Sequence, residues 1–244
     1  MIKFTKNFYQ KGVRKKVISL GLDSGSSMTK AVLFKDDHII KTKMIPTSIS
    51  PRKSLEELYL DMINEKERID VVVTTGYGRN LLEQADFKIT EITCHAAGAF
   101  FMNPDCNTII DIGGQDSKVI TIDDLGCVTD FLMNDKCAAG TGRFLEMTMK
   151  RVESEIVGLL AQDIPPEDIV LGCVESICQR TAAFAQKLAP VNPKVFFSGG
   201  LAQFDVMKQS LARHLRIKEV VTDPLCQYTG AIGAAVLGIQ KKKR

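Results

Sequence analysis

Apolar and polar positions alternate so as to divide the chain into short strands joined by tight turns. The apolar run at 17–21 predicts a buried strand, and 28–34 predicts the strand that returns after a Gly- and Ser-rich turn. The same order appears again at 108–112 and 117–122, and the stretch CVTDFLM predicts a third strand there. We therefore expect two similar β units in one chain.

Helical spacing of apolar positions is found in other parts of the chain. Residues 54–66 predict a helix, with Ser54 as the N-cap and Glu57 three residues later. A small-residue helix is expected at 230–240, and another helix is expected to begin near Gly140. Two further short strands are expected at 70–74 and 195–197.

One motif occurs twice in the same context. The pattern D-x-G-x-x-x-[ST]-K begins at Asp23 and again at Asp111, 88 residues later. Each copy follows an apolar strand and precedes another. We interpret the repeat as an internal duplication that gives two related lobes facing each other.

The turns inside this motif suit a phosphate. Backbone N–H groups of such turns point into a common space, and glycine allows a phosphate to approach closely. Ser26, Ser27 and Thr29 add hydroxyl groups, Lys30 adds a positive charge, and a third turn of this kind stands at Gly199-Gly200. For one copy, a plain hairpin with small turn residues would be the better interpretation. For the pair, we expect two turns that clamp a polyphosphate.

Acidic residues accompany both turns. Asp23, Asp111 and Asp116 suit a hard cation such as Mg²⁺, usually through water. The chain contains no Walker A motif and no G-x-G-x-x-G, so P-loop and dinucleotide-binding folds are disfavoured.

Composition excludes several classes of protein. Hydrophobic residues make up 45% and charged residues 25% of the 244 residues, as in soluble globular proteins, and no apolar run is long enough for a membrane helix. The net charge of +3 comes from the basic ends, 1–16 and 241–244. Without their ten basic residues, 22 basic residues remain against 29 acidic ones, and 17–240 has a net charge of −7. An acidic body argues against nucleic-acid binding.

Cysteine usage indicates a reducing compartment. The chain has seven cysteines and no C-x-x-C pair, so we expect a cytoplasmic protein rather than a secreted disulfide scaffold. We do not interpret Cys94-His95 as a metal site, because adjacent residues of a strand point apart. Cys173 and Cys178 lie five residues apart on an expected helix, which does not place them on one face.

The three turns together resemble the superfamily of acetate and sugar kinases, heat-shock chaperone ATPases and actin. Within it, the chain is similar to the ATPase activators of 2-hydroxyacyl-CoA dehydratases, BadF/BadG/BcrA/BcrD-like ATPases whose relatives serve benzoyl-CoA reductases and double-cubane-cluster proteins. The stretches that carry this resemblance are LGLDSGSSMTKAV, TTGYGRN (74–80), EITCHAAGA (91–99), DIGGQDSKVI (111–120), MNDKCAAGTGRFLE (133–146) and QYTGAIGAA (227–235).

The resemblance implies an α/β fold with two actin-like, ribonuclease H-like lobes. The first lobe would span 17–104, the second 105–228, and a final helix at 229–240 would pack back onto the first lobe. It implies ATP or ADP with Mg²⁺ in the cleft, and four residues in catalysis: Asp23, Asp111, Gln115 and Asp116. The nucleotide-binding residues that it implies are Ser26, Ser27, Met28, Thr29, Lys30, Gly113, Gly114, Gln115, Gly140, Thr141, Gly199, Gly200 and Gln227.

The resemblance also implies a redox role. In these activators, ATP turnover drives a low-potential electron from a [4Fe–4S] cluster that bridges a homodimer into a partner iron–sulfur dehydratase or reductase, and a ferredoxin or flavodoxin supplies the electron. Cys137 is the implied cluster ligand. It stands just before an expected helix start, where the helix dipole stabilises a thiolate.

One segment departs from the family pattern. The activators carry a second cluster cysteine in a stretch reading roughly C-T-V-F-A-E-S-E, whereas here Arg151 is followed directly by V-E-S-E, and Cys173 and Cys178 come later. Either the segment is deleted, or the sequence holds only ordered residues and a loop between Arg151 and Val152 has been left out. We favour the second explanation. It predicts that these Cα atoms lie far beyond the roughly 3.8 Å of a trans peptide and that the structure contains no cluster.

Two other functions stay open on the sequence alone. A small-molecule kinase of the same superfamily would use Asp111 or Asp116 as a base on a substrate hydroxyl. A non-redox regulatory ATPase would bind a protein partner and contain no iron.

Overall fold

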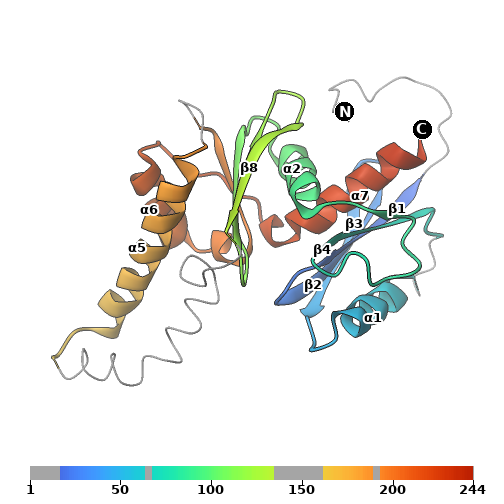
Figure 1. The fold of residues 1–244 in the computed structure, drawn as a ribbon, viewed down its shortest axis with the longest axis horizontal. Helices are drawn as coiled ribbons and strands as arrows, with labels where there is room; N and C mark the ends of the chain where they lie inside the picture. The colour runs from blue at the N-terminus through green and yellow to red at the C-terminus, as the bar shows by residue number, and fades with distance from the viewer. Residues whose placement is uncertain (1–16, 64–67, 135–161, 189–192, 244) are drawn as a thin grey trace.

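The computed structural model describes residues 17–63, 68–134, 162–188 and 193–243. It contains two sheets that lie side by side (Figure 1). The first has the order β3-β2-β1-β4-β5 and the second the order β8-β7-β6-β9. The strands of the first sheet are β1 (Ile18–Ser24), β2 (Met28–Lys35), β3 (His38–Pro46), β4 (Val71–Gly76) and β5 (Phe87–Lys88). Those of the second are β6 (Thr108–Ile112), β7 (Ser117–Ile122), β8 (Val128–Asn134) and β9 (Val195–Ser198).

The two sheets repeat one topology. In each, a central strand (β1 or β6) pairs antiparallel with the next strand in the chain and parallel with a later strand, β4 or β9. Each copy also ends in a third antiparallel strand, β3 or β8. The repeat in the sequence therefore has a counterpart in the fold, which is an α/β architecture built on two sheets.

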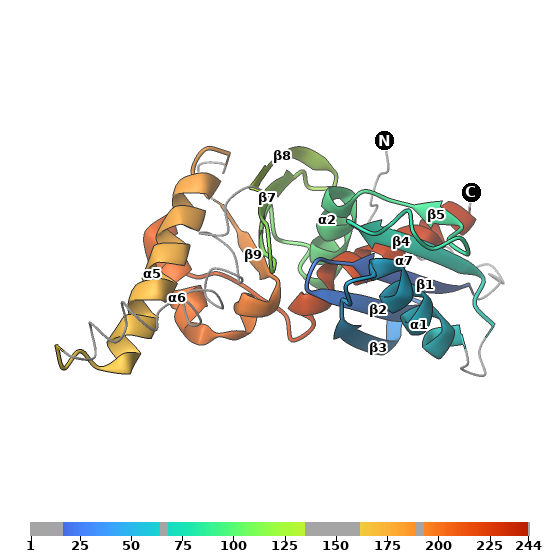
Figure 2. The same cartoon turned by 60° about the horizontal axis from the view of Figure 1, so that its bottom comes forward.

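Helices cover both faces of each sheet (Figure 2). On the first sheet, α1 (Pro51–Ile63) packs on one face and α7 (Thr229–Lys242) on the other. On the second sheet, α5 (Pro166–Ala185) and α6 (Asp205–Leu215) share one face, and α2 (Glu91–Met102) covers the other. The short helices η2 (Gly200–Gln203) and η3 (Cys226–Tyr228) connect these elements. The division into lobes near residue 104 stays a prediction, and the two sheets lie on either side of that residue.

Helix α2 links the two halves. Cys94 and Ala97 pack with β4 and α7, whereas Ala96 and Ala99 pack with β6 and β7. The helix crosses α7 closely, because a Cβ atom at Gly233 would lie 1.7 Å from the carbonyl oxygen of Cys94. The junction between the sheets is therefore a tightly packed pair of helices.

Two local expectations were wrong. Helix α1 begins at Pro51 rather than near Ser54, and Ser54 is a buried residue whose Oγ accepts a hydrogen bond from the Ser48 N–H at 2.9 Å. Proline suits a first helical turn, which explains the earlier start. Cys94 and His95 belong to helix α2, not to a strand. Within the ranges that the structure describes, no helix has the length and apolar character needed to span a membrane.

Candidate functional site

The two copies of the repeated motif have the same strand register. Asp23 on β1 stands opposite Lys30 on β2, and Asp111 on β6 stands opposite Lys118 on β7. The carboxylate–ammonium distances are 4.0 Å in the first copy and 3.2 Å in the second. A cross-strand acid–base pair therefore sits below each turn.

The predicted turns meet in space. A Cβ atom at Gly114 would lie 2.0 Å from Ser27 Oγ, so the turn of the second sheet touches the turn of the first. Gly199 follows β9, the neighbour of β6, and a Cβ there would lie 2.3 Å from the Ile112 carbonyl oxygen. The Gly199 N–H also donates to the Cys226 carbonyl at 3.2 Å, beside Gln227. Turns that are far apart in the sequence thus share one region.

The exposure of the predicted binding residues differs along this region. Ser26, Ser27 and Gln115 are exposed at the tips of their turns, and a Cβ at Gly200 would meet nothing within 4 Å. Met28, Lys30, Gly113, Gly114 and Gln227 are partly buried. Thr29 is buried beneath the first turn, where its hydroxyl lies 2.9 Å from that of Thr47. The exposed hydroxyls and open glycine are therefore the groups free to approach a ligand.

Asp111 is the predicted catalytic acid with the most side-chain partners among the described residues. Its Oδ1 accepts a hydrogen bond from Ser198 Oγ at 2.5 Å and lies 3.5 Å from His95 Nε2, and its Oδ2 accepts one from Lys118 Nζ at 3.2 Å. Burial would raise the pKa of Asp111, but His95 and Lys118 more than offset this and hold it well below the usual range. Asp111 is therefore a fixed, ionised carboxylate and a poor general base.

Lys118 joins this carboxylate to two more acids. Its side chain is only 1% exposed, and Nζ lies 2.8 Å from Asp116 and 2.9 Å from Glu91 on α2. Burial would lower the pKa of Lys118, yet the three carboxylates raise it, so the lysine stays charged. Burial raises the pKa of Asp116, partly offset by Lys118. Through these ion pairs, Lys118 holds the second turn against α2.

Asp23 differs from Asp111 in that one of its carboxylate oxygens is unpartnered. Asp23 is buried, and its Oδ1 has no hydrogen-bond partner among the described residues. A buried carboxylate oxygen without a partner is costly unless a ligand, water or cation satisfies it. Asp23 therefore fits the Mg²⁺ or water expected beside bound phosphates.

Sequence reasoning missed three residues of this region. His95, Glu91 and Ser198 all contact the Asp111–Lys118 pair. The stretch EITCHAAGA contains the first two, but the expectation of a strand at Cys94-His95 is wrong, and Glu91 and His95 lie one turn apart on α2. Ser198 could have been found from its place directly before Gly199-Gly200.

Several predictions lie outside the described residues. These are the nucleotide contacts of Gly140 and Thr141, the cluster ligand Cys137 and the Cα separation between Arg151 and Val152.

The four buried cysteines that the structure describes do not suit an iron–sulfur cluster. Burial raises the pKa of Cys94 and Cys106 to about 12, and it also raises the pKa of Cys178 and Cys226. Protonated, buried thiols are poor cluster ligands, which must be thiolates. In the described part of the chain, no three or more His, Cys, Asp or Glu side chains gather in a way that could hold a metal ion.

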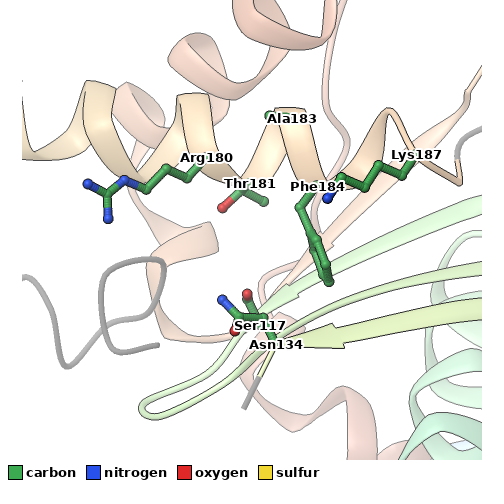
Figure 3. A pocket seen from close by; sticks show the side chains of 7 residues that line it. All are labelled: Ser117, Asn134, Arg180, Thr181, Ala183, Phe184 and Lys187. Carbon is green, nitrogen blue, oxygen red and sulfur yellow. The ribbon is translucent and has the colours of Figure 1, made fainter. Parts of the chain in front are cut away.

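A cavity of about 250 Å³ lies beside the second turn (Figure 3). Ser117 and Asn134 line it from the ends of β7 and β8, and side chains of α5, including Phe184, line the opposite side. Because successive side chains of a strand point to opposite faces, it lies across the sheet from Lys118. None of the predicted site residues lines it.

Comparison with known proteins identifies the family of this chain. Residues 20–156 and 152–238 match the model of the BadF/BadG/BcrA/BcrD ATPase family. The chain is 36% identical to the (R)-2-hydroxyglutaryl-CoA dehydratase activating ATPase of Acidaminococcus fermentans, over 92% of this chain and 98% of that protein. Its fold matches the activator of the 2-hydroxyisocaproyl-CoA dehydratase from Clostridium difficile with bound ADPNP, with a TM-score of 0.84 and 35% identity over 93% and 96% of the two chains. A ROK family glucokinase from Streptomyces griseus, 13% identical with a TM-score of 0.65 over 91% of this chain and 99% of its own, shares the fold alone.

The same comparison bears on the departure at residue 151. The alignment with the A. fermentans protein extends over 258 positions, more than the 244 residues of this chain, so the relative has residues without a counterpart here. The two parts matched by the family model overlap at 152–156, directly after the position where the sequence departs from the family pattern. With a match along most of its length to this model and to a dehydratase activator, the chain belongs to the BadF/BadG/BcrA/BcrD ATPase family and is an ATPase.

Proposed function

We propose that this ATPase binds Mg·ATP between its two phosphate turns. Ser26, Ser27 and Lys30 would contact the phosphates from the first sheet, and the turn from Gly113 to Gln115 would do so from the second. Gly199, Gly200 and Gln227 would border the adenosine, and Gly140 and Thr141 would complete the site. Asp23, through its unpartnered oxygen, would hold the Mg²⁺ shell or orient the attacking water. Asp111 and Asp116 would act through charge rather than as bases.

We further propose that ATP turnover activates a partner dehydratase or reductase. The observation that carries this proposal is the similarity over 92% of the chain to a protein named as a dehydratase activating ATPase. The meeting of the turns supports it, because ATP can favour one arrangement of the two sheets only through contacts that differ between arrangements. A kinase activity has less support, since Asp111 is a poor base and the kinase likeness is one of fold alone.

The redox part of the proposal is a [4Fe–4S] cluster shared by two copies of the chain, with Cys137 as a ligand from each. Such a cluster would supply the low-potential electron, delivered to it by a ferredoxin or flavodoxin. Four thiolates are needed, and the buried cysteines Cys94, Cys106, Cys178 and Cys226 do not suit the remaining positions. The chain's own residues therefore give no further step through this group.

Iron content tests the redox part directly. If the cluster bridges two copies, protein purified without oxygen should be brown and contain about four iron atoms per dimer, and Cys137→Ala should remove both colour and iron. Chelation should then loosen the dimer in size-exclusion chromatography. Colourless, iron-free protein that still hydrolyses ATP would overturn the redox part and leave the ATPase.

The absent cysteine segment favours a second candidate. A chain with Cys137 and no second ligand would be a regulatory ATPase that binds its partner in a nucleotide-dependent way without carrying an electron. Iron-free wild-type protein that binds a dehydratase only with ATP would identify this role.

A further inference from the structure

His95 occupies the junction between the two phosphate turns. It lies on α2, the helix that packs against both sheets, and is 5% exposed. Its Nδ1 lies 3.0 Å from the carbonyl oxygen of Glu91, and its Nε2 lies 3.5 Å from Asp111 Oδ1. Both ring nitrogens face acceptors, which is the arrangement of an imidazolium with a proton on each nitrogen.

The imidazole also lies beside the carboxylate of the other turn. Around the position that a Cβ atom of Gly230 would take, Asp23 Oδ2 lies at 2.6 Å and His95 Cε1 at 3.0 Å. The two groups are therefore separated by less than about 6 Å, close enough for an imidazolium and a carboxylate to attract each other. The missing side chain at Gly230, on the first turn of α7, is what allows this approach.

This arrangement orients Asp23. One oxygen, Oδ2, faces Gly230 and His95 and lies 4.0 Å from Lys30 Nζ, which leaves Oδ1 as the oxygen without a partner. The charged groups that face His95 from the other elements and from its own helix are Asp111, Lys118 and Glu91. Carboxylates therefore outnumber ammonium groups around the imidazole. A cation between Asp23 and Asp111 offsets the repulsion between two turns that must both approach a polyphosphate.

We propose that His95 is a positioning residue for ATP hydrolysis: it bridges Asp23 and Asp111 at the junction of the two sheets and aims Asp23 Oδ1 at the nucleotide. This rests on the proposed placement of Mg·ATP between the turns. It predicts an effect on turnover rather than on binding, because the hydroxyl and N–H groups of the turns are untouched. The pairing of a helix-borne histidine with the acids of both turns thus sets the catalytic geometry.

Two variants separate this role from a purely structural one. His95→Gln keeps a polar side chain and removes the cation, whereas Gly230→Ala keeps His95 and places a methyl group between it and Asp23. Steady-state ATPase kinetics of the full chain should show kcat at least tenfold lower in both, with KM for ATP changed less than threefold. The matched controls are His214→Gln, which breaks the 2.8 Å contact with Glu175, and Gly172→Ala, whose Cβ meets nothing within 4 Å. Both should keep the wild-type kcat.

Thermal melting of each variant gives its folded fraction. Each kcat is divided by that fraction, so that it is expressed per folded molecule. Unchanged kcat per folded molecule in both test variants would overturn the proposal, and so would an equal fall in His214→Gln. If His95→Gln folds poorly, Gly230→Ala alone decides, because it leaves the histidine in place. The readout is ATP hydrolysis, so failure to activate a dehydratase would contradict the proposed partner without touching this result.

Discussion

Replacing Lys118 with methionine is expected to lower the free energy of unfolding by about 3–5 kcal/mol, because removal of one partner from a buried ionic group leaves the others uncompensated. The Lys118 ammonium lies within 3.2 Å of Asp111 and even closer to Asp116 and Glu91. Methionine fills a similar volume but provides no charge. Three neighbouring carboxylates would then repel one another across the contact between the second turn and α2.

Urea unfolding of the two proteins measures this difference. The control is Lys208→Met, which removes an ion pair with Asp205 of 2.6 Å whose carboxylate side chain is 81% exposed. Exposed pairs contribute about 1 kcal/mol or less, so the control should unfold close to the wild type. A Lys118→Met protein within 1 kcal/mol of the wild type would mean that the network does not hold the second turn in place.

The second large effect concerns the crossing of α2 and α7. Alanine at Gly233 would place Cβ 1.7 Å from the Cys94 carbonyl oxygen and 2.8 Å from the Gly98 nitrogen, both of them backbone atoms that cannot turn aside. The helices would have to separate, and overpacking of this kind costs roughly 1–3 kcal/mol or more. We expect Gly233→Ala to destabilise the protein by at least 2 kcal/mol, although alanine favours a helix by about 1 kcal/mol over glycine.

The same substitution elsewhere should have the opposite sign. Gly172 lies within α5, and a Cβ there meets nothing within 4 Å. Gly172→Ala should therefore stabilise the protein by up to about 1 kcal/mol. Thermal or urea denaturation compares the two variants, and a Gly233→Ala protein as stable as Gly172→Ala would contradict the close crossing.

The strands were predictable because their signals are local. The apolar patterns around the repeat at Asp23 and Asp111 predict β6 and β7 with their observed bounds and β2 to within one residue. Strand β1 extends three residues beyond its predicted end at residue 21. Helix α2 was not predicted as a helix, because it is buried on two sides. Its residues EITCHAAGAFFM therefore show no polar face, and without a polar face the helical period disappears. Strand β3 lies at the edge of its sheet and most of its residues are partly buried, so its apolar and polar positions do not alternate clearly.

The candidate site was predictable in its turns but not in its network. Small residues and hydroxyl groups mark a phosphate turn within a few positions of the sequence, so Ser27 and Gly114 can each be predicted separately. The contact between them is visible only in the three-dimensional structure. Lys118 shares its motif position with Lys30, yet its side chain is 1% exposed against 20% for Lys30. Lys118 also pairs with Glu91 on α2, a long-range neighbour that no motif spacing reveals.

The most direct measurement is the activity of a purified 2-hydroxyacyl-CoA dehydratase incubated without oxygen with this protein, a low-potential reductant and Mg·ATP. We predict that the dehydratase becomes active only when both the protein and ATP are present, and that it stays inactive with a non-hydrolysable ATP analogue. A dehydratase that stays inactive while the protein hydrolyses ATP beside it would contradict an activator role.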